Sequence, residues 1–207
     1  DETPALIQNV LENEENPAIL ANAIRGLGRF HGKETHQALL KFLNTQSFRN
    51  ELAVAAMSAI RQLDDDELQP AVFQSLRENA KQFRSRDYGR ALETLAHTSR
   101  RLEDRSEVRK FLADHLDHPK TSIQAAAVQA LGTLGDPKAI TVLEAISQSE
   151  NERISRPAQQ AVSKLREAKP TTPKEILELR KEIAEVKKES DKLKTELKTL
   201  REQVEAK

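Results

Sequence analysis

A repeat with intervals of 33, 35, 36 and 34 residues constrains the fold of this chain more than any other sequence feature. The intervals separate five apolar anchors that end the segments AIRGL, MSAI, ALETL, AVQAL and AVSKL. These anchors are Leu27, Ile60, Leu95, Leu131 and Leu165. A repeat of this length is typical of solenoids, in which each repeat is one unit that packs only on its neighbours.

Each interval also holds a second apolar segment with helical spacing, which indicates a hairpin of two helices. The members of these segments are Leu39, Leu40, Leu43, Val72, Phe73, Leu76, Val108, Phe111, Leu112, Ile140, Leu143 and Ile146. A single hairpin cannot bury its apolar stripe, whereas stacked hairpins can. We therefore predict an all-α fold, a right-handed α-solenoid of about five helical hairpins.

Composition agrees with helix packing and excludes several kinds of function. Only 3% of the residues are aromatic and none is Trp, so a core must consist of Leu, Ile, Val and Ala. The 33 basic and 33 acidic side chains cancel to a net charge of +0, which argues against a nucleic-acid partner. The chain has no Cys and no apolar run of about 18 residues, so we expect no thiol chemistry and no membrane span.

The segment LGTLGDPKA holds two glycines that could belong to a phosphate-binding loop or to a turn between helices. The turn is favoured because glycine is optional at the corresponding positions of other repeats: GLGRFHGKE contains it, whereas IRQLDDDEL lacks it. We expect Gly132 to allow close approach of two backbones and Gly135 to end one helix. Asp136 and Pro137 then begin the next helix.

The stretch AAAVQALGTLGDPKAITVLEAI resembles a HEAT-like repeat of the phycobilin-lyase type, and the other units over residues 1–168 are similar to more divergent HEAT repeats. A narrower resemblance lies in FRSRDYGRALETLAHTSRRLEDRSEVRKFLADHLDHP. It is similar to the helical region that follows the catalytic domain of some bacterial aminopeptidase N-like zinc metallopeptidases. That resemblance implies a zinc-dependent catalytic domain upstream of Asp1.

After the solenoid, the proline-containing segment 169–173 predicts a hinge, and residues 174–207 predict a coiled coil. Apolar residues recur there at alternating spacings of three and four, with one polar exception. The predicted seam consists of Ile176, Leu179, Ile183, Val186, Ser190, Leu193, Leu197, Leu200 and Val204. Such a stripe on a lone helix would face water, so we predict that it pairs.

The charges beside the seam favour a parallel homodimer. Each Glu on one strand would face a Lys or Arg of the other strand, whereas an antiparallel pair would oppose like charges throughout. The predicted pairs are Glu175 with Arg180, Glu182 with Lys187, Glu189 with Lys194, and Glu196 with Arg201. A solvated single helix, or one that packs on the solenoid, remains the alternative.

No catalytic or metal-binding motif stands out, and we expect no cofactor in this chain. His115 and His118 have the spacing of metal ligands, but Pro119 places them at a helix end, where a structural role is favoured. No H-E-x-x-H motif occurs. The acidic run from Asp64 to Glu67 lies between two helices, where carboxylates favour the helix that follows.

An excess of positive charge between residues 81 and 110 makes this the candidate partner surface on the solenoid, although a solvated, internally paired surface is the simpler interpretation. The residues proposed for it are Arg84, Arg86, Arg90, Arg100, Arg101 and Arg105. The function we predict is non-catalytic protein binding by residues 1–168, with dimerisation through residues 174–207. The alternative is an accessory domain of a zinc-dependent aminopeptidase.

Overall fold

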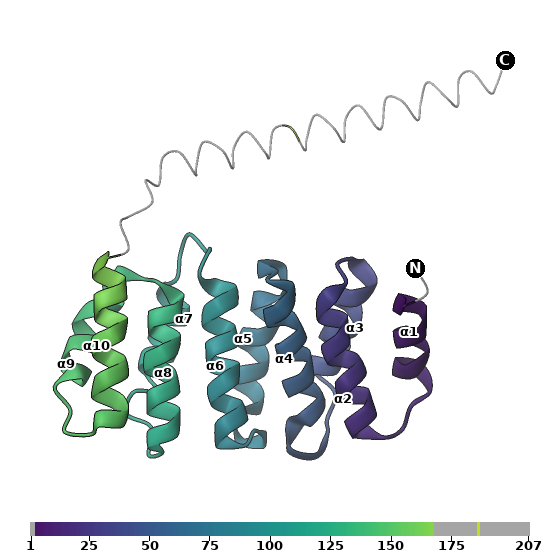
Figure 1. Ribbon diagram of the computed structural model, residues 1–207, viewed down its shortest axis with the longest axis horizontal. Coiled ribbons are helices and arrows are strands. Elements are labelled where there is room, and N and C mark those ends of the chain that lie inside the picture. Colours follow the sequence, from purple (N-terminus) through teal and green to yellow (C-terminus); the bar gives the residue numbers. More distant parts are fainter. Residues whose placement is uncertain (1–2, 168–185, 187–207) are drawn as a thin grey trace. The chain divides into compact units, whose positions relative to one another are not determined.

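The computed structural model describes residues 3–167 and residue 186, and ten α-helices lie in that part of the chain (Figure 1). Their bounds are α1 (Thr3–Asn13), α2 (Pro17–Gly26), α3 (Lys33–Leu43), α4 (Glu51–Leu63), α5 (Gln69–Asn79), α6 (Ser85–Ser99), α7 (Ser106–Ala113), α8 (Thr121–Leu134), α9 (Ile140–Ser147) and α10 (Glu152–Glu167). Short 3₁₀ turns at Leu27–Arg29, Phe48–Asn50, Asp66–Leu68, Ala80–Gln82 and Pro137–Ala139 adjoin several of them. The described residues contain no strand, so the predicted all-α class is confirmed.

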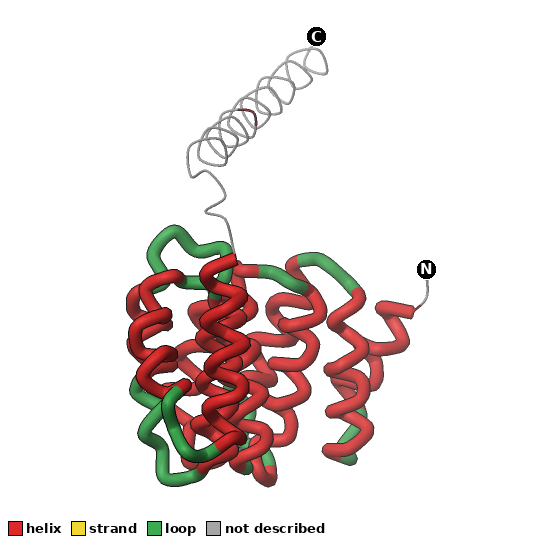
Figure 2. Tube along the Cα trace, turned by 60° about the vertical axis from the view of Figure 1, so that its left-hand side comes forward, coloured by secondary structure: helices red, strands yellow, loops and turns green. Residues whose placement is uncertain are grey.

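Consecutive helices pair into five hairpins that stack in two layers. The even-numbered helices pack side by side in the order α2, α4, α6, α8 and α10, and the odd-numbered helices form the second layer (Figures 1 and 2). We call the first of these the even layer. This arrangement confirms the solenoid predicted from the repeat.

All five anchors of the sequence repeat are buried in the resulting core. They lie in, or directly after, the five helices of the even layer. The second apolar segments fall in α3, α5, α7 and α9, where Leu39, Leu76 and Leu143 are fully buried. Leu40 differs because it follows the buried Leu39 by about 100° around the helix, and 37% of it is exposed.

The turn between α8 and α9 has the conformation that the sequence predicts. Gly135 ends α8 with a φ of +70°, a left-handed conformation that glycine adopts without steric cost. The Asp136 carboxylate accepts a hydrogen bond from the backbone N–H of Lys138, and Pro137 begins the following 3₁₀ turn. The loop is therefore a helix turn rather than a phosphate-binding loop.

The described helices belong to one compact unit within residues 1–167. The predicted hinge at 169–173 lies outside the described residues. The same is true of the predicted coiled coil except for Val186, which is helical and 65% exposed. Among the described helices, none is both long and apolar enough to cross a membrane.

Candidate functional site

At three contacts between neighbouring helices of the even layer, a glycine permits a close approach. A Cβ atom on Gly28, Gly89 or Gly132 would lie 2.9 Å from an atom of the neighbouring helix. The atoms approached are the Ala59 carbonyl oxygen and the Cβ atoms of Ala126 and Ala161. Glycine thus lets α4 approach the end of α2, α8 approach α6, and α10 approach α8.

The joint between α4 and α6 has no such glycine contact in the described part of the chain, and a groove of about 320 Å³ lies there. Its lining includes the apolar side chains of Val54, Met57 and Ala91. Val54 is half-buried, whereas Met57 and Ala91 are buried and form the floor of this groove. We call this feature the α4–α6 groove.

Charged side chains surround the apolar part of the α4–α6 groove. Arg25, Arg61 and Arg90 bring positive charge, and Asp87 and Glu93 bring negative charge. Arg61 Nη1 lies 3.3 Å from Glu93 Oε2, so this pair links α4 to α6 across the groove. An apolar floor with polar groups at its edge is the usual composition of a protein-binding site.

The predicted basic surface divides into two groups. Arg84, Arg86 and Arg90 are exposed, and Arg90 contributes to the α4–α6 groove. The other group makes contacts within the solenoid. Arg105 Nη1 donates to the carbonyl oxygens of Leu134 and Gly135, at 3.2 and 3.1 Å, at the end of α8.

Arg100 and Arg101 bind the acidic turn, defined as residues 64–67, between α4 and α5. Asp64 Oδ2 accepts from Arg100 Nη2 at 2.6 Å and from Arg101 Nη1 at 3.0 Å. His97 Nε2 lies 2.9 Å from Asp64 Oδ1, although this oxygen accepts no hydrogen bond of good geometry. Sequence analysis predicted helix capping for this acidic run, and Asp65 does cap, whereas Asp64 links α4 to the end of α6.

These contacts shift two pKa values. The hydrogen bond from Arg100, followed by the positive charges of Arg100, Arg101 and His97, holds the pKa of Asp64 well below its usual range. Burial and the nearby Arg100 lower the pKa of His97, although the Asp64 carboxylate opposes this shift. The ionised carboxylate and the neutral imidazole are therefore the favoured forms near neutral pH.

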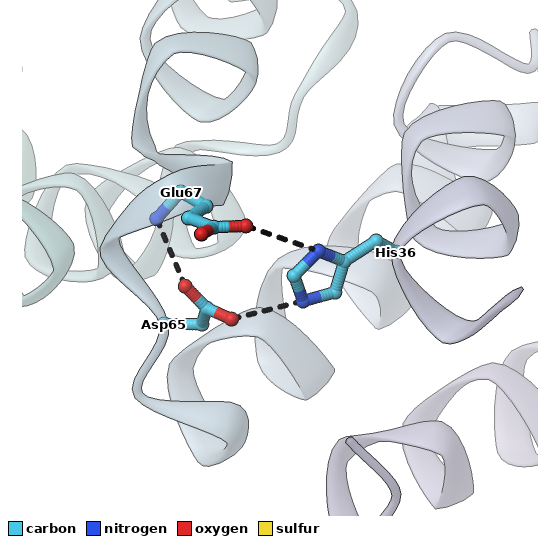
Figure 3. A group of neighbouring side chains, drawn as sticks. All are labelled: His36, Asp65 and Glu67. Atoms are coloured by element: carbon cyan, nitrogen blue, oxygen red, sulfur yellow. Dashed lines mark hydrogen bonds and ion pairs between the residues drawn. The ribbon is translucent and has the colours of Figure 1, made fainter. Parts of the chain in front are cut away.

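The acidic turn also gathers a histidine from the preceding repeat (Figure 3). His36 of α3 lies between two carboxylates, with Nε2 at 2.9 Å from Asp65 Oδ2 and Nδ1 at 3.8 Å from Glu67 Oε2. Donor atoms of these three side chains lie within 4.8 Å of one another. Sequence analysis missed this group because His36 stands 29 residues before Asp65, almost one repeat away.

His115 and His118, the histidine pair with metal-ligand spacing, form hydrogen bonds within the solenoid. His115 Nδ1 lies 2.8 Å from the Phe111 carbonyl oxygen, and Nε2 lies 2.8 Å from Tyr88 Oη. The partners assign a proton to Nδ1, which leaves Nε2 to accept from the Tyr88 hydroxyl. His118 Nδ1 accepts from the backbone N–H of Lys120 at 3.0 Å.

An exposed aromatic side chain lies in the turn that leads into α4. The side chain of Phe48 is 74% exposed, and the Arg49 guanidinium lies over its ring at 4.7 Å from the centroid. Arg49 and Asn50 have φ values of 55° and 58°, a left-handed conformation that is rare outside glycine. An exposed aromatic side chain beside arginine is a common anchor in protein interfaces.

The described helices α6 to α10 coincide with a known repeat. Residues 86–163 match the family model of HEAT repeats. This part of the chain consists of HEAT-like repeats. HEAT repeats generally mediate contacts between proteins, which supports a role in protein binding. The match gives no support to the resemblance to aminopeptidase N-like enzymes, and no curated protein matches the chain.

Proposed function

We propose that this HEAT-like solenoid is a non-catalytic protein-binding module and that the α4–α6 groove receives a segment of the partner protein. The observation that carries the proposal is the groove itself, which lies at the joint of the even layer without a glycine contact. An apolar side chain of the partner would replace water over the half-buried Val54. Burial of apolar area provides the main driving force for such association.

The charges around the groove define the flanking chemistry of that segment. Three arginines stand against two carboxylates, and one arginine is already paired with Glu93. The other two arginines, Arg25 of α2 and Arg90 of α6, also line the groove. We therefore propose a partner segment in which an apolar residue is flanked by acidic residues.

Peptide selection tests this proposal directly, because it does not require the partner to be identified first. A random 16-residue library displayed on phage would be selected on the full chain, and the recovered peptides measured by fluorescence anisotropy. We expect acidic peptides with an apolar centre, with at least tenfold weaker binding to Arg90→Glu. Arg77→Glu, which changes an exposed arginine of α5, is the matched control. Equal binding to both variants would contradict the groove as the binding site.

We also propose that residues 174–207 join two copies as a parallel coiled coil. The support for this comes from the sequence, namely the heptad seam and the four complementary Glu–Lys or Glu–Arg pairs. Leu193→Pro should abolish dimerisation in multi-angle light scattering while the solenoid retains its helical circular dichroism and unfolding transition. Leu193→Asp, compared with the adjacent Lys192→Asp, separates loss of the seam from a general effect of charge. A Leu193→Asp variant that is still dimeric would refute the proposal.

A further inference from the structure

Two turns of the solenoid share one backbone design. Asp65 and Asp136 each begin a 3₁₀ turn that leads into α5 or α9, and each Oδ1 accepts from the backbone N–H two residues later at 2.9 Å. The preceding residues, Asp64 and Gly135, both have left-handed φ values, at 55° and 70°. The two turns are therefore equivalent positions of the repeat.

In both turns the second carboxylate oxygen of the aspartate pairs with a basic side chain. Asp136 Oδ2 pairs with Arg109 of α7, and Asp65 Oδ2 pairs with His36 of α3. Arg109 and His36 are each the fourth residue of their helix, counted from Ser106 and Lys33. Each basic side chain thus ties one repeat to the cap of the next.

The side chains around the two aspartates differ in whether they can donate a lone pair to a metal ion. One turn holds Arg109 and Lys138, whereas the other holds His36 and Glu67 at the same places. Arginine is never deprotonated in proteins, and a protonated lysine has no free lone pair. Imidazole nitrogen and carboxylate oxygen are both metal donors. Two changes at equivalent positions therefore replace two cations by two ligands.

We propose that His36, Asp65 and Glu67 bind a divalent transition-metal ion of the Zn²⁺ class and so connect the second repeat to the third (Figure 3). One nitrogen and two oxygen donors suit Zn²⁺, whereas Ca²⁺ and Mg²⁺ favour oxygen donors alone. Three protein ligands leave a fourth tetrahedral position for water. This site is separate from the α4–α6 groove and does not depend on its function.

The geometry needs a small separation of two donors and a rotation of the Glu67 side chain. Two donors bound tetrahedrally at about 2.0 Å from zinc lie roughly 3.3 Å apart. His36 Nε2 and Asp65 Oδ2 are 2.9 Å apart, so they would separate by a few tenths of an ångström. Their side chains are 20% and 23% exposed, and Asp65 is already fixed by its cap. Glu67 now faces Nδ1, and its side chain, which is 80% exposed, has room to turn towards the same ion.

The solenoid supplies its own matched control for the test. The variant His36→Arg with Glu67→Lys places the side chains of the equivalent turn around Asp65, so it retains an ion pair while removing two ligands. We would titrate ZnCl₂ into the full chain and this variant by isothermal calorimetry. Thermal unfolding of both proteins would be measured with and without zinc.

We expect the native chain to bind one more equivalent of zinc than the variant, and its midpoint of unfolding to rise with zinc while that of the variant does not. The metal-free midpoints of the two proteins should agree, which shows that the variant folds. A single Glu67→Gln change should weaken zinc binding at least tenfold. Equal zinc stoichiometry and affinity in the native chain and the double variant would overturn the proposal and would assign any binding to other histidines. Absence of zinc binding to the native chain would also overturn it.

Discussion

Replacement of Asp64 by Asn is the sharpest test of how the second and third repeats are held together. Asp64 ends α4 in a left-handed conformation with a φ of 55°. Asn is the residue best suited to that conformation after glycine. The substitution therefore preserves the backbone and the side-chain shape while it removes the negative charge.

The expected loss follows from the three contacts of the carboxylate. His97, Arg100 and Arg101 lie 2.9, 2.6 and 3.0 Å from its oxygens, and the Asp64 side chain is 38% exposed. Partly exposed ion pairs contribute about 0.5 to 1 kcal/mol each, so the two arginine pairs give about 1 to 2 kcal/mol, and the neutral His97 adds no ion pair. Because the Asn carbonyl still accepts one hydrogen bond, we expect a loss of about 1 to 1.5 kcal/mol in the free energy of unfolding. For a chain of this size, that loss lowers the midpoint of thermal unfolding by about 3 to 5 °C.

Urea unfolding followed by circular dichroism measures this difference, with Asp66→Asn as the control. Asp66 has one longer contact, 3.7 Å from Arg101 Nε, so its loss should remain below about 0.5 kcal/mol. Because the pKa of Asp64 is lowered in the folded chain, its contribution is present above the unfolded pKa of about 3.9 and is lost as pH falls below it. Equal stability of Asp64→Asn and the native chain at pH 7, or an equal loss in both variants, would show that the Asp64 charge does not hold these repeats together.

Three further predictions concern other parts of the solenoid. Gly132→Ala should lower the free energy of unfolding in urea by about 1 to 3 kcal/mol, because the new Cβ would lie 2.9 Å from the Cβ of Ala161. Gly26→Ala is the control: its nearest contact would be at 3.5 Å, so it should not destabilise the chain. Gly135→Ala should lower the stability by about 1 kcal/mol because of its φ of +70°, and an unchanged midpoint would contradict the assigned helix end. Because the pKa of His97 is lowered in the folded chain, protonation of His97 destabilises the fold as pH falls below the unfolded pKa of about 6.5. The His97→Gln variant should therefore lose less unfolding free energy than the native chain between pH 7.5 and 5.5.

The sequence was sufficient to predict the elements whose cause is local. Leu131 and Leu165 recur at the repeat interval and are buried, and Gly135 with Asp136 forms the predicted turn. These features follow from helical periodicity and from the conformations that glycine and aspartate favour. The repeat and its turns could therefore be located from the residues alone.

Contacts between repeats could not be predicted in the same way. Whether Arg100 faces solvent or Asp64 depends on how two hairpins stack, and residue spacing does not specify that geometry. The same applies to His36 and Asp65, which meet only because adjacent repeats are in register. The left-handed Arg49 carries no sequence signal, since no glycine marks it. Only the helix-capping part of the acidic run could be predicted from neighbouring residues.

The α4–α6 joint, which lacks a glycine contact among the described residues, has a mechanical consequence. At the other joints of the even layer, a glycine brings neighbouring helices close together. The second and third repeats share the apolar core and are also linked by the pairs Arg61–Glu93 and His36–Asp65 and by the contacts of Asp64. Ionic contacts weaken with salt, whereas steric contacts do not. We therefore expect the ionic contacts across the α4–α6 joint to weaken as ionic strength rises.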